Sequence, residues 1–198
     1  MFENFKIGGI IPLTTIDYPH ELSAVVFCQG CLWHCPYCHN KHLASQHKET
    51  QYSFDDLHKF LNKRKGLLEA IVFSGGEPTL QDDLPAVIQE VKLMGFKIGL
   101  HTTGFDSIRF SKVLNLCDWI GFDVKNILNT KYDLITGVKD SATEVLKSLN
   151  LLIESGKKYE LRITQDQKLI TESDLWEIQQ YLSLKFKADL KVQKAIQR

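Results

Sequence analysis

The sequence predicts an α/β fold built on a mainly parallel sheet. Short apolar runs alternate along the chain with longer segments whose apolar residues recur at helical spacing. Unusual residue combinations follow several of the short runs, at the points where strands would end. Right-handed crossovers place all such ends at one rim, where ligands bind to parallel sheets. We therefore expect the chemistry of the chain to converge there.

In the first half of the chain, strands are expected at three apolar runs: Leu22–Phe27, Ala70–Phe73 and Phe96–Leu100. A helix over Phe54–Asn62 is expected to begin after Ser53, which with Asp56 resembles a capping box. A second helix carries apolar residues at i, i+3, i+4 and i+7 from Leu84, and Gly95 would end it. Each expected helix lies between two expected strands, as βαβ units require.

The second half continues the alternation. Strands are expected at Trp119–Val124, Tyr159–Ile163 and Leu190–Ile196. Helices are expected at Ile108–Leu116, from Val145 to Ile153 with a stop at Gly156, and at Leu175–Leu182. We expect one domain over residues 1–198, with a core at about 20–165, an N-terminal arm at 1–19 and a C-terminal segment at 185–198 that the pattern defines poorly.

Composition narrows the class of protein. Lys+Arg and Asp+Glu both number 24, so net charge points neither to nucleic acid nor to an anionic membrane. The apolar runs fall short of the roughly 18 residues that span a bilayer, and the N-terminus lacks the apolar core of a signal peptide. A cytoplasmic location is expected, where five cysteines favour metal or redox chemistry over disulfides.

The cysteine loop is the most informative segment. Cys31, Cys35 and Cys38 form a C-x3-C-x2-C motif just after the first expected strand. Three thiolates on one loop can hold three irons of a 4Fe–4S cluster and leave the fourth iron open to a ligand. The alternative is a zinc site that adds Cys28, although structural zinc usually uses cysteine pairs that are farther apart. Cys28 and Cys117 are interpreted as buried core thiols.

The segment Ser74-Gly75-Gly76-Glu77-Pro78 follows the next expected strand. It is a turn, but two consecutive glycines exceed what a turn requires. Without Cβ atoms they would let a ligand approach the backbone directly.

Together these motifs resemble the radical S-adenosylmethionine superfamily, over about Ile10 to Arg162. Within it, the segments Gly9–Pro19, Val25–Cys31 and Cys35–Asn40 resemble the activating proteins of anaerobic ribonucleotide reductases, which belong to the glycyl-radical-enzyme activases. The resemblance implies a partial (β/α)6 barrel of the radical SAM type with its cofactors at the open rim.

The resemblance also implies roles for residues. Cys31, Cys35 and Cys38 would hold the cluster, and its open iron would bind the amino and carboxylate groups of S-adenosylmethionine. The cofactor would contact the following set: Tyr37, Asn40, Gly75, Gly76, Glu77, Thr102, Asp123, Lys125 and Arg162. The glycines and Glu77 would receive the amino group, whereas Asp123 and Lys125 would lie near the carboxylate or, alternatively, form only a surface ion pair.

The chain departs from the resemblance at two places. His101 stands where activases often carry an acidic residue, so the resemblance assigns no cofactor contact to it. The segment after Arg162 is Ile-Thr-Gln-Asp-Gln, which is more polar than in relatives and weakens the expectation of a last strand. His34 and His39 are expected to lie beside the cluster or on the surface rather than to bind iron.

The implied activity is reductive cleavage of S-adenosylmethionine, giving a 5′-deoxyadenosyl radical that forms a glycyl radical on an anaerobic ribonucleoside-triphosphate reductase. Flavodoxin or ferredoxin would supply the electron. Three alternatives stay open: an activase of the pyruvate formate-lyase type, a radical enzyme acting on a small molecule such as a deazaguanine precursor, and a zinc-binding interaction module without catalysis.

Overall fold

A computed structural model describes residues 2–195 of the protein. Its sheet has seven strands in the order β1-β2-β3-β4-β5-β6-β7. Strand β1 (Ile7–Thr14) runs antiparallel to β2 (Ser23–Cys28), and every later neighbour pair is parallel. The remaining strands are β3 (Ala70–Gly75), β4 (Lys97–Thr102), β5 (Trp119–Asp123), β6 (Lys158–Gln165) and β7 (Leu190–Lys194).

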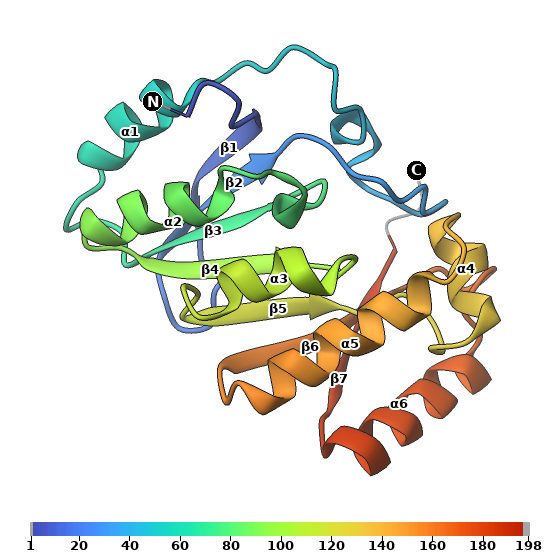
Figure 1. Ribbon diagram of the computed structural model, residues 1–198. Coiled ribbons are helices and arrows are strands. Elements are labelled where there is room, and N and C mark those ends of the chain that lie inside the picture. The colour runs from blue at the N-terminus through green and yellow to red at the C-terminus, as the bar shows by residue number, and fades with distance from the viewer. Residues whose placement is uncertain (1, 196–198) are drawn as a thin grey trace.

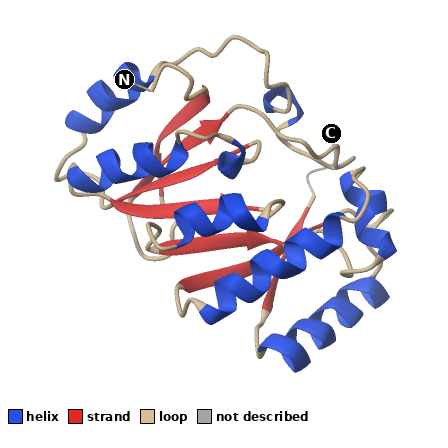
Figure 2. Ribbon diagram, viewed as in Figure 1, coloured by secondary structure: helices blue, strands red, loops and turns tan. Residues whose placement is uncertain are grey.

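Helices connect the parallel strands. They are α1 (Phe54–Asn62), α2 (Leu84–Leu93), α3 (Ser107–Leu114), α4 (Thr130–Thr136), α5 (Ser141–Glu154) and α6 (Glu172–Phe186), with short 3-10 turns η1 (Lys41–Leu43) and η2 (Pro78–Leu80). Helices α1, α2, α3, α5 and α6 lie along one face of the sheet (Figures 1 and 2). The parallel part, β2 to β7, has the alternation of the expected partial (β/α)6 barrel. Among the described residues, no helix has the length and apolar character needed to traverse a bilayer.

The predicted signals at the ends of α1, α2 and α5 are confirmed, although α5 begins four residues earlier than predicted and α6 extends three residues before and four residues beyond its predicted bounds. The predicted bounds of α1 are those observed, and the capping box is formed in both directions: the Asp56 N–H donates to Ser53 Oγ at 3.2 Å, and the Ser53 N–H donates to Asp56 Oδ2 at 3.0 Å. Gly95 and Gly156 follow α2 and α5 with φ of +97° and +65°, a backbone conformation that glycine adopts at little cost.

Three elements differ from the expectation. The N-terminal arm contains β1, whose two glycines and Pro12 obscure the strand pattern. Helix α4 was not predicted because its short sequence shows little apolar periodicity. The polar segment after Arg162 does not interrupt the sheet, since Thr164 pairs with Gln193 in β7. Strand β7 ends at Lys194, and the predicted end at Ile196 lies outside the described residues.

The two faces of the sheet differ in chemistry because side chains alternate along each strand. One face buries an apolar core against the helices, including Val26, Phe73, Leu100, Phe122 and Ile163. The opposite face carries a small aromatic cluster around Tyr18 and Trp119, together with polar side chains near the strand ends. The register places Asp123 opposite Arg162 and His101 opposite Gly121 on that second face.

Candidate functional site

The predicted site residues converge on one cavity of about 160 Å³ at the C-terminal ends of the parallel strands. Every residue predicted to hold the cluster or the cofactor lines it: Cys31, Cys35, Tyr37, Cys38, Asn40, Gly75, Gly76, Glu77, Thr102, Asp123, Lys125 and Arg162. The remaining lining residues are Trp33, His39, Ser74, His101, Thr103 and Thr164. Segments dispersed over more than a hundred residues are therefore brought together by the sheet.

Backbone hydrogen bonds hold the cysteine loop to two other segments of the chain. Gly30 N–H donates to Leu43 O at 2.7 Å, and Cys31 N–H donates to Ala44 O at 3.0 Å. On the other side, His34 N–H donates to Thr136 O at 2.8 Å, so α4 supports the loop. The three thiols of the loop are free, with Cys38 exposed and the other two partly buried.

The other two cysteines lie in the core, as predicted. Cys28 ends β2 on the helix-covered face, and burial raises the pKa of its thiol. Burial also raises the pKa of Cys117 to about 12. A zinc site that used Cys28 would require this side chain to leave the core. The described loop therefore presents three thiols to the cavity.

The absence of side chains at the two glycines allows a close contact between backbones. Gly76 N–H donates to Cys28 O at 2.9 Å, and Glu77 N–H donates to Gly30 O at 2.8 Å. A Cβ on Gly75 would lie 2.6 Å from the backbone of Cys28, and a Cβ on Gly76 would overlap the Gly30 carbonyl. They make room for the base of the cysteine loop. Both glycines also line the cavity, and the expectation that their backbone groups bind a ligand stays a prediction.

Glu77 is the centre of a rigid wall. Its side chain is buried, with the residue 2% exposed, and the carboxylate accepts five hydrogen bonds. Oε1 accepts from the Thr79 N–H and from the hydroxyls of Thr79 and Thr102, while Oε2 accepts from the N–H and hydroxyl of Thr103 at 2.8 and 2.7 Å. The bonds join the turn after β3 to the end of β4.

This arrangement limits what Glu77 and Thr102 can offer a ligand. The Thr102 hydroxyl donates to Glu77 at 2.7 Å and accepts from the Gly104 N–H at 3.1 Å. The sequence did not predict the roles of Thr79 and Thr103, whose hydroxyls both donate to Glu77. Thr103 is more than 20 residues from Glu77 in the sequence, and Thr79 lies in the turn that follows it. The available signal was the pair Thr102-Thr103 at the C-terminal end of β4.

Asn40 and Tyr37 connect the cysteine loop to the other walls. The Asn40 side-chain amide donates to Gly75 O at 3.1 Å, and the Tyr37 hydroxyl donates to Lys125 O at 3.4 Å. Trp33 packs edge-on against Tyr132 of α4, with ring centroids 5.9 Å apart.

A charged cluster forms the wall at β5 and β6. Arg162 donates through Nε and Nη2 to Asp123 Oδ1 at 3.0 and 2.9 Å, and Lys125 Nζ lies 3.6 Å from Asp123 Oδ2. Burial would raise the pKa of Asp123, but Arg162 and Lys125 outweigh it and lower this pKa. Burial opposes the charge of Lys125, yet Asp123, Tyr37 and Cys35 raise its pKa overall. Asp123 and Lys125 do form the ion pair considered as the alternative, but it lines the cavity.

These residues suit an iron–sulfur cluster and a zwitterionic ligand. Three thiols on a single loop supply the ligands that iron–sulfur clusters use. Two cations against one carboxylate leave a net positive wall, which favours a ligand carboxylate.

The sequence profile of the Radical SAM superfamily matches residues 25–166, which include the cysteine loop, the glycine turn and the charged wall. The chain belongs to the radical SAM superfamily. Membership implies a 4Fe–4S cluster and S-adenosylmethionine as cofactors, in agreement with the prediction from the cysteine spacing.

Curated relatives indicate which group within the superfamily the chain resembles. A protein of Methanocaldococcus jannaschii, named provisionally as a glycyl-radical enzyme activating enzyme, is 34% identical over 87% of this chain and 73% of its own length. The pyruvate formate-lyase-activating enzyme of Clostridium pasteurianum is 28% identical over 67% of this chain. This radical SAM protein thus belongs with the glycyl-radical enzyme activating enzymes. It spans 57% of the clostridial enzyme's length.

Solved structures agree on the fold. SuiB from Streptococcus suis, bound to S-adenosylmethionine, matches 86% of this chain and 39% of its own length with a TM-score of 0.65 at 16% identity.

Proposed function

We propose that this radical SAM protein forms a glycyl radical on an anaerobic ribonucleoside-triphosphate reductase. The observation that carries the proposal is that three free thiols and the charged wall of Asp123, Lys125 and Arg162 line the same cavity. The resemblance of Gly9–Pro19 to the reductase-activating proteins supports this choice of partner.

In this proposal Cys31, Cys35 and Cys38 hold the cluster and leave one iron open. When bound, the cluster and S-adenosylmethionine supply one-electron cleavage of a carbon–sulfur bond, which releases methionine and lets the adenosyl fragment take a hydrogen atom from the partner's glycine. Flavodoxin or ferredoxin would provide the electron, and a cytoplasmic location would keep the five free thiols reduced.

The chain's own residues would bind and orient the cofactor. Lys125 and Arg162 supply the positive charge that attracts the methionyl carboxylate, and Asp123 keeps both cations in place. Tyr37 and Asn40 would flank the cofactor from the cysteine loop. Glu77 and Thr102 would act chiefly by fixing the wall through which Gly75 and Gly76 present their backbone groups.

An activase of the pyruvate formate-lyase type is the second candidate, because the clostridial relative carries that name. A small-molecule substrate or a zinc module receives no such support from the curated relatives described above.

The two candidates are separated by one experiment. The protein is purified anaerobically, reconstituted with iron and sulfide, and incubated with S-adenosylmethionine, dithionite and either the reductase or pyruvate formate-lyase of the same organism. Electron spin resonance then detects a glycyl doublet. We expect the doublet on the reductase.

A doublet only on pyruvate formate-lyase would transfer the assignment to the second candidate. Cofactor cleavage without a doublet on either partner would remove the activase proposal. Iron and sulfide content, measured on the same sample, would show whether the cluster had formed.

A further inference from the structure

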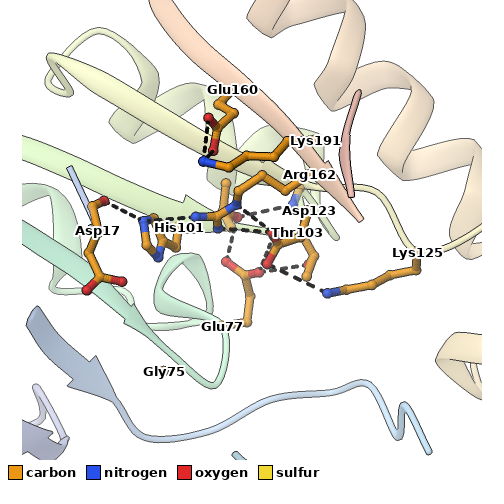
Figure 3. A network of polar contacts seen from close by, with 12 residues as sticks. Asp17, Gly75, Glu77, His101, Thr103, Asp123, Lys125, Glu160, Arg162 and Lys191 are labelled. Atoms are coloured by element: carbon orange, nitrogen blue, oxygen red, sulfur yellow. Dashed lines mark hydrogen bonds and ion pairs between the residues drawn. The ribbon is translucent and has the colours of Figure 1, made fainter. Parts of the chain in front are cut away.

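A line of polar contacts leads from the N-terminal arm to the charged wall of the cavity (Figure 3). His101 Nε2 lies 2.9 Å from the backbone carbonyl of Asp17 and 3.1 Å from Arg162 Nη1. Arg162 then binds Asp123 through Nε and Nη2. Both contacts involve the same ring nitrogen, so a neutral imidazole makes one hydrogen bond there, donating to the Asp17 carbonyl or accepting from Arg162, and packs against the other group.

The sheet is shaped to accept the arginine. Gly121 pairs with His101 in β4 and with Glu160 in β6. A Cβ on Gly121 would lie 2.7 Å from Arg162 Cζ, so the guanidinium rests on the space that a side chain would fill. With Arg162 only 7% exposed, it has little freedom to turn toward water.

The neighbouring carboxylate does not compete for this arginine. Glu160 forms an ion pair with Lys191 of β7 at 3.0 Å (Figure 3). Arg162 therefore keeps its ion pair with Asp123. An acidic side chain at position 101 would draw the guanidinium from Asp123, whereas a neutral imidazole contacts it without a competing charge.

The N-terminal arm packs against the same face of the sheet, beside His101. The Tyr18 ring packs on Trp119 with centroids 5.5 Å apart, and Gly99 leaves room for it. The His101 ring stands edge-on to the same tryptophan, also at 5.5 Å. The Thr14 hydroxyl donates to Asp17 Oδ2 at 2.6 Å, which fixes the turn that presents the Asp17 carbonyl.

We propose that His101 is a positioning residue of the cofactor site: it seats Arg162, which holds the Asp123 carboxylate in the cavity wall, and it ties both to the arm segment Thr14–Tyr18. The inference rests on the proposed cofactor site, but it does not depend on which enzyme is the partner.

The test compares two substitutions in the reconstituted holoprotein. His101→Phe keeps an aromatic ring beside Trp119 and removes the polar contacts, whereas His101→Gln restores a donor and an acceptor. His47→Gln changes an exposed loop histidine and is the matched control. We measure the dissociation constant for S-adenosylmethionine by equilibrium dialysis, the iron content, and hydrogen exchange over residues 14–18.

His101→Phe should weaken cofactor binding about tenfold, the scale on which supporting contacts act at such sites, and should speed exchange in the arm while leaving iron content unchanged. His101→Gln should recover most of the affinity. Unchanged binding and exchange in His101→Phe would overturn the inference, and so would a loss of affinity that glutamine does not recover.

Gly121→Ala provides an independent variant if His101→Phe does not fold. Its Cβ would lie 2.7 Å from Arg162 Cζ and 2.9 Å from Trp119 Cη2, so it should weaken cofactor binding and also speed exchange in the arm that packs on Trp119. Wild-type affinity in this variant would contradict the role of Arg162. Failure of the proposed function has a different signature, because the glycyl doublet would be absent while these affinity differences persist.

Discussion

The Glu77 wall and the cysteine loop, which line the same cavity, differ in how many of their polar side-chain groups already have partners. The wall around Glu77 has five hydrogen bonds on one buried carboxylate and packs glycine backbone against the base of the cysteine loop. The cysteine loop is held by backbone hydrogen bonds to segments on either side, but its three thiols are free and Cys38 is exposed.

This difference assigns separate tasks to the two walls. A buried carboxylate with all its partners is costly to disturb, so the Glu77 wall is rigid before any ligand binds. The thiols instead gain their partners when the cluster binds. The largest losses of function should come from the cysteine loop, and the largest losses of stability from the Glu77 wall.

The strongest effect is expected for Cys31→Ala, Cys35→Ala or Cys38→Ala. Each removes one of three ligands, so iron content and S-adenosylmethionine cleavage should fall to background. Cys117→Ser and Cys28→Ala are the controls, because both side chains lie in the core. Iron and sulfide analysis together with the absorbance of the cluster measures the result. Loss of iron in Cys28→Ala would restore the four-cysteine site as a candidate.

The next effect should come from Gly76→Ala, which acts on both walls at once. The new Cβ meets the Gly30 carbonyl, so the base of the cysteine loop must move. We expect reduced iron loading as well as weaker cofactor binding. Gly9→Ala is the control, since its Cβ would make only an ordinary 3.8 Å contact with Phe27. Normal iron loading in Gly76→Ala would mean that the loop tolerates the shift.

Glu77→Gln should lower the free energy of unfolding by about 3 kcal/mol, because the amide nitrogen faces donors where a carboxylate oxygen accepted hydrogen bonds. Urea unfolding of the protein before cluster reconstitution measures this directly. Asp55→Asn, on the exposed side of α1, is a control with the same change of charge. Equal unfolding midpoints in the two variants would show that the wall is not a source of stability.

The smallest effect concerns pH. Burial and the Arg162 charge lower the pKa of His101 to about 4, although Asp123 and the Asp17 carbonyl oppose the shift. Between the unfolded value of about 6.5 and the folded one, only the unfolded chain takes up this proton. Stability from the neutral imidazole is therefore complete above about pH 6.5 and declines as pH falls toward 4.

Wild type should accordingly lose more stability than His101→Gln between pH 7 and 5, by a difference on the order of 1 kcal/mol. Urea midpoints at both pH values provide the comparison. A parallel decline in the two proteins would show that His101 titrates normally.

Local patterns determined much of what the sequence could predict. Apolar periodicity and the Ser53–Asp56 box are properties of adjacent residues, and α1 was predicted with its observed bounds. Strand ends were predicted to within a few residues, which sufficed to gather the site. Strand β1 and helix α4 escaped notice because their burial depends on the rest of the fold rather than on their own pattern.

The sequence predicted which residues make up the site but not the contacts between them. The cysteine spacing identified the three thiols, and strand ends supplied Asp123 and Arg162. The bonds of Glu77 to Thr102 and Thr103 span about 25 residues, and the contact of Gly76 with Gly30 is between backbones. Long-range contacts of this kind leave no periodic signal in the sequence.

The pairing of Asp123 with Arg162 also limits how such a chain can change over time. A single inserted residue within β5 or β6 would turn the charged side chains into the apolar layer and present Phe122 or Leu161 to the cavity. Substitutions at the rim and length changes in the loops beyond it leave this alternation intact. New specificities in this lineage should therefore arise through loops and point replacements rather than through altered strand lengths.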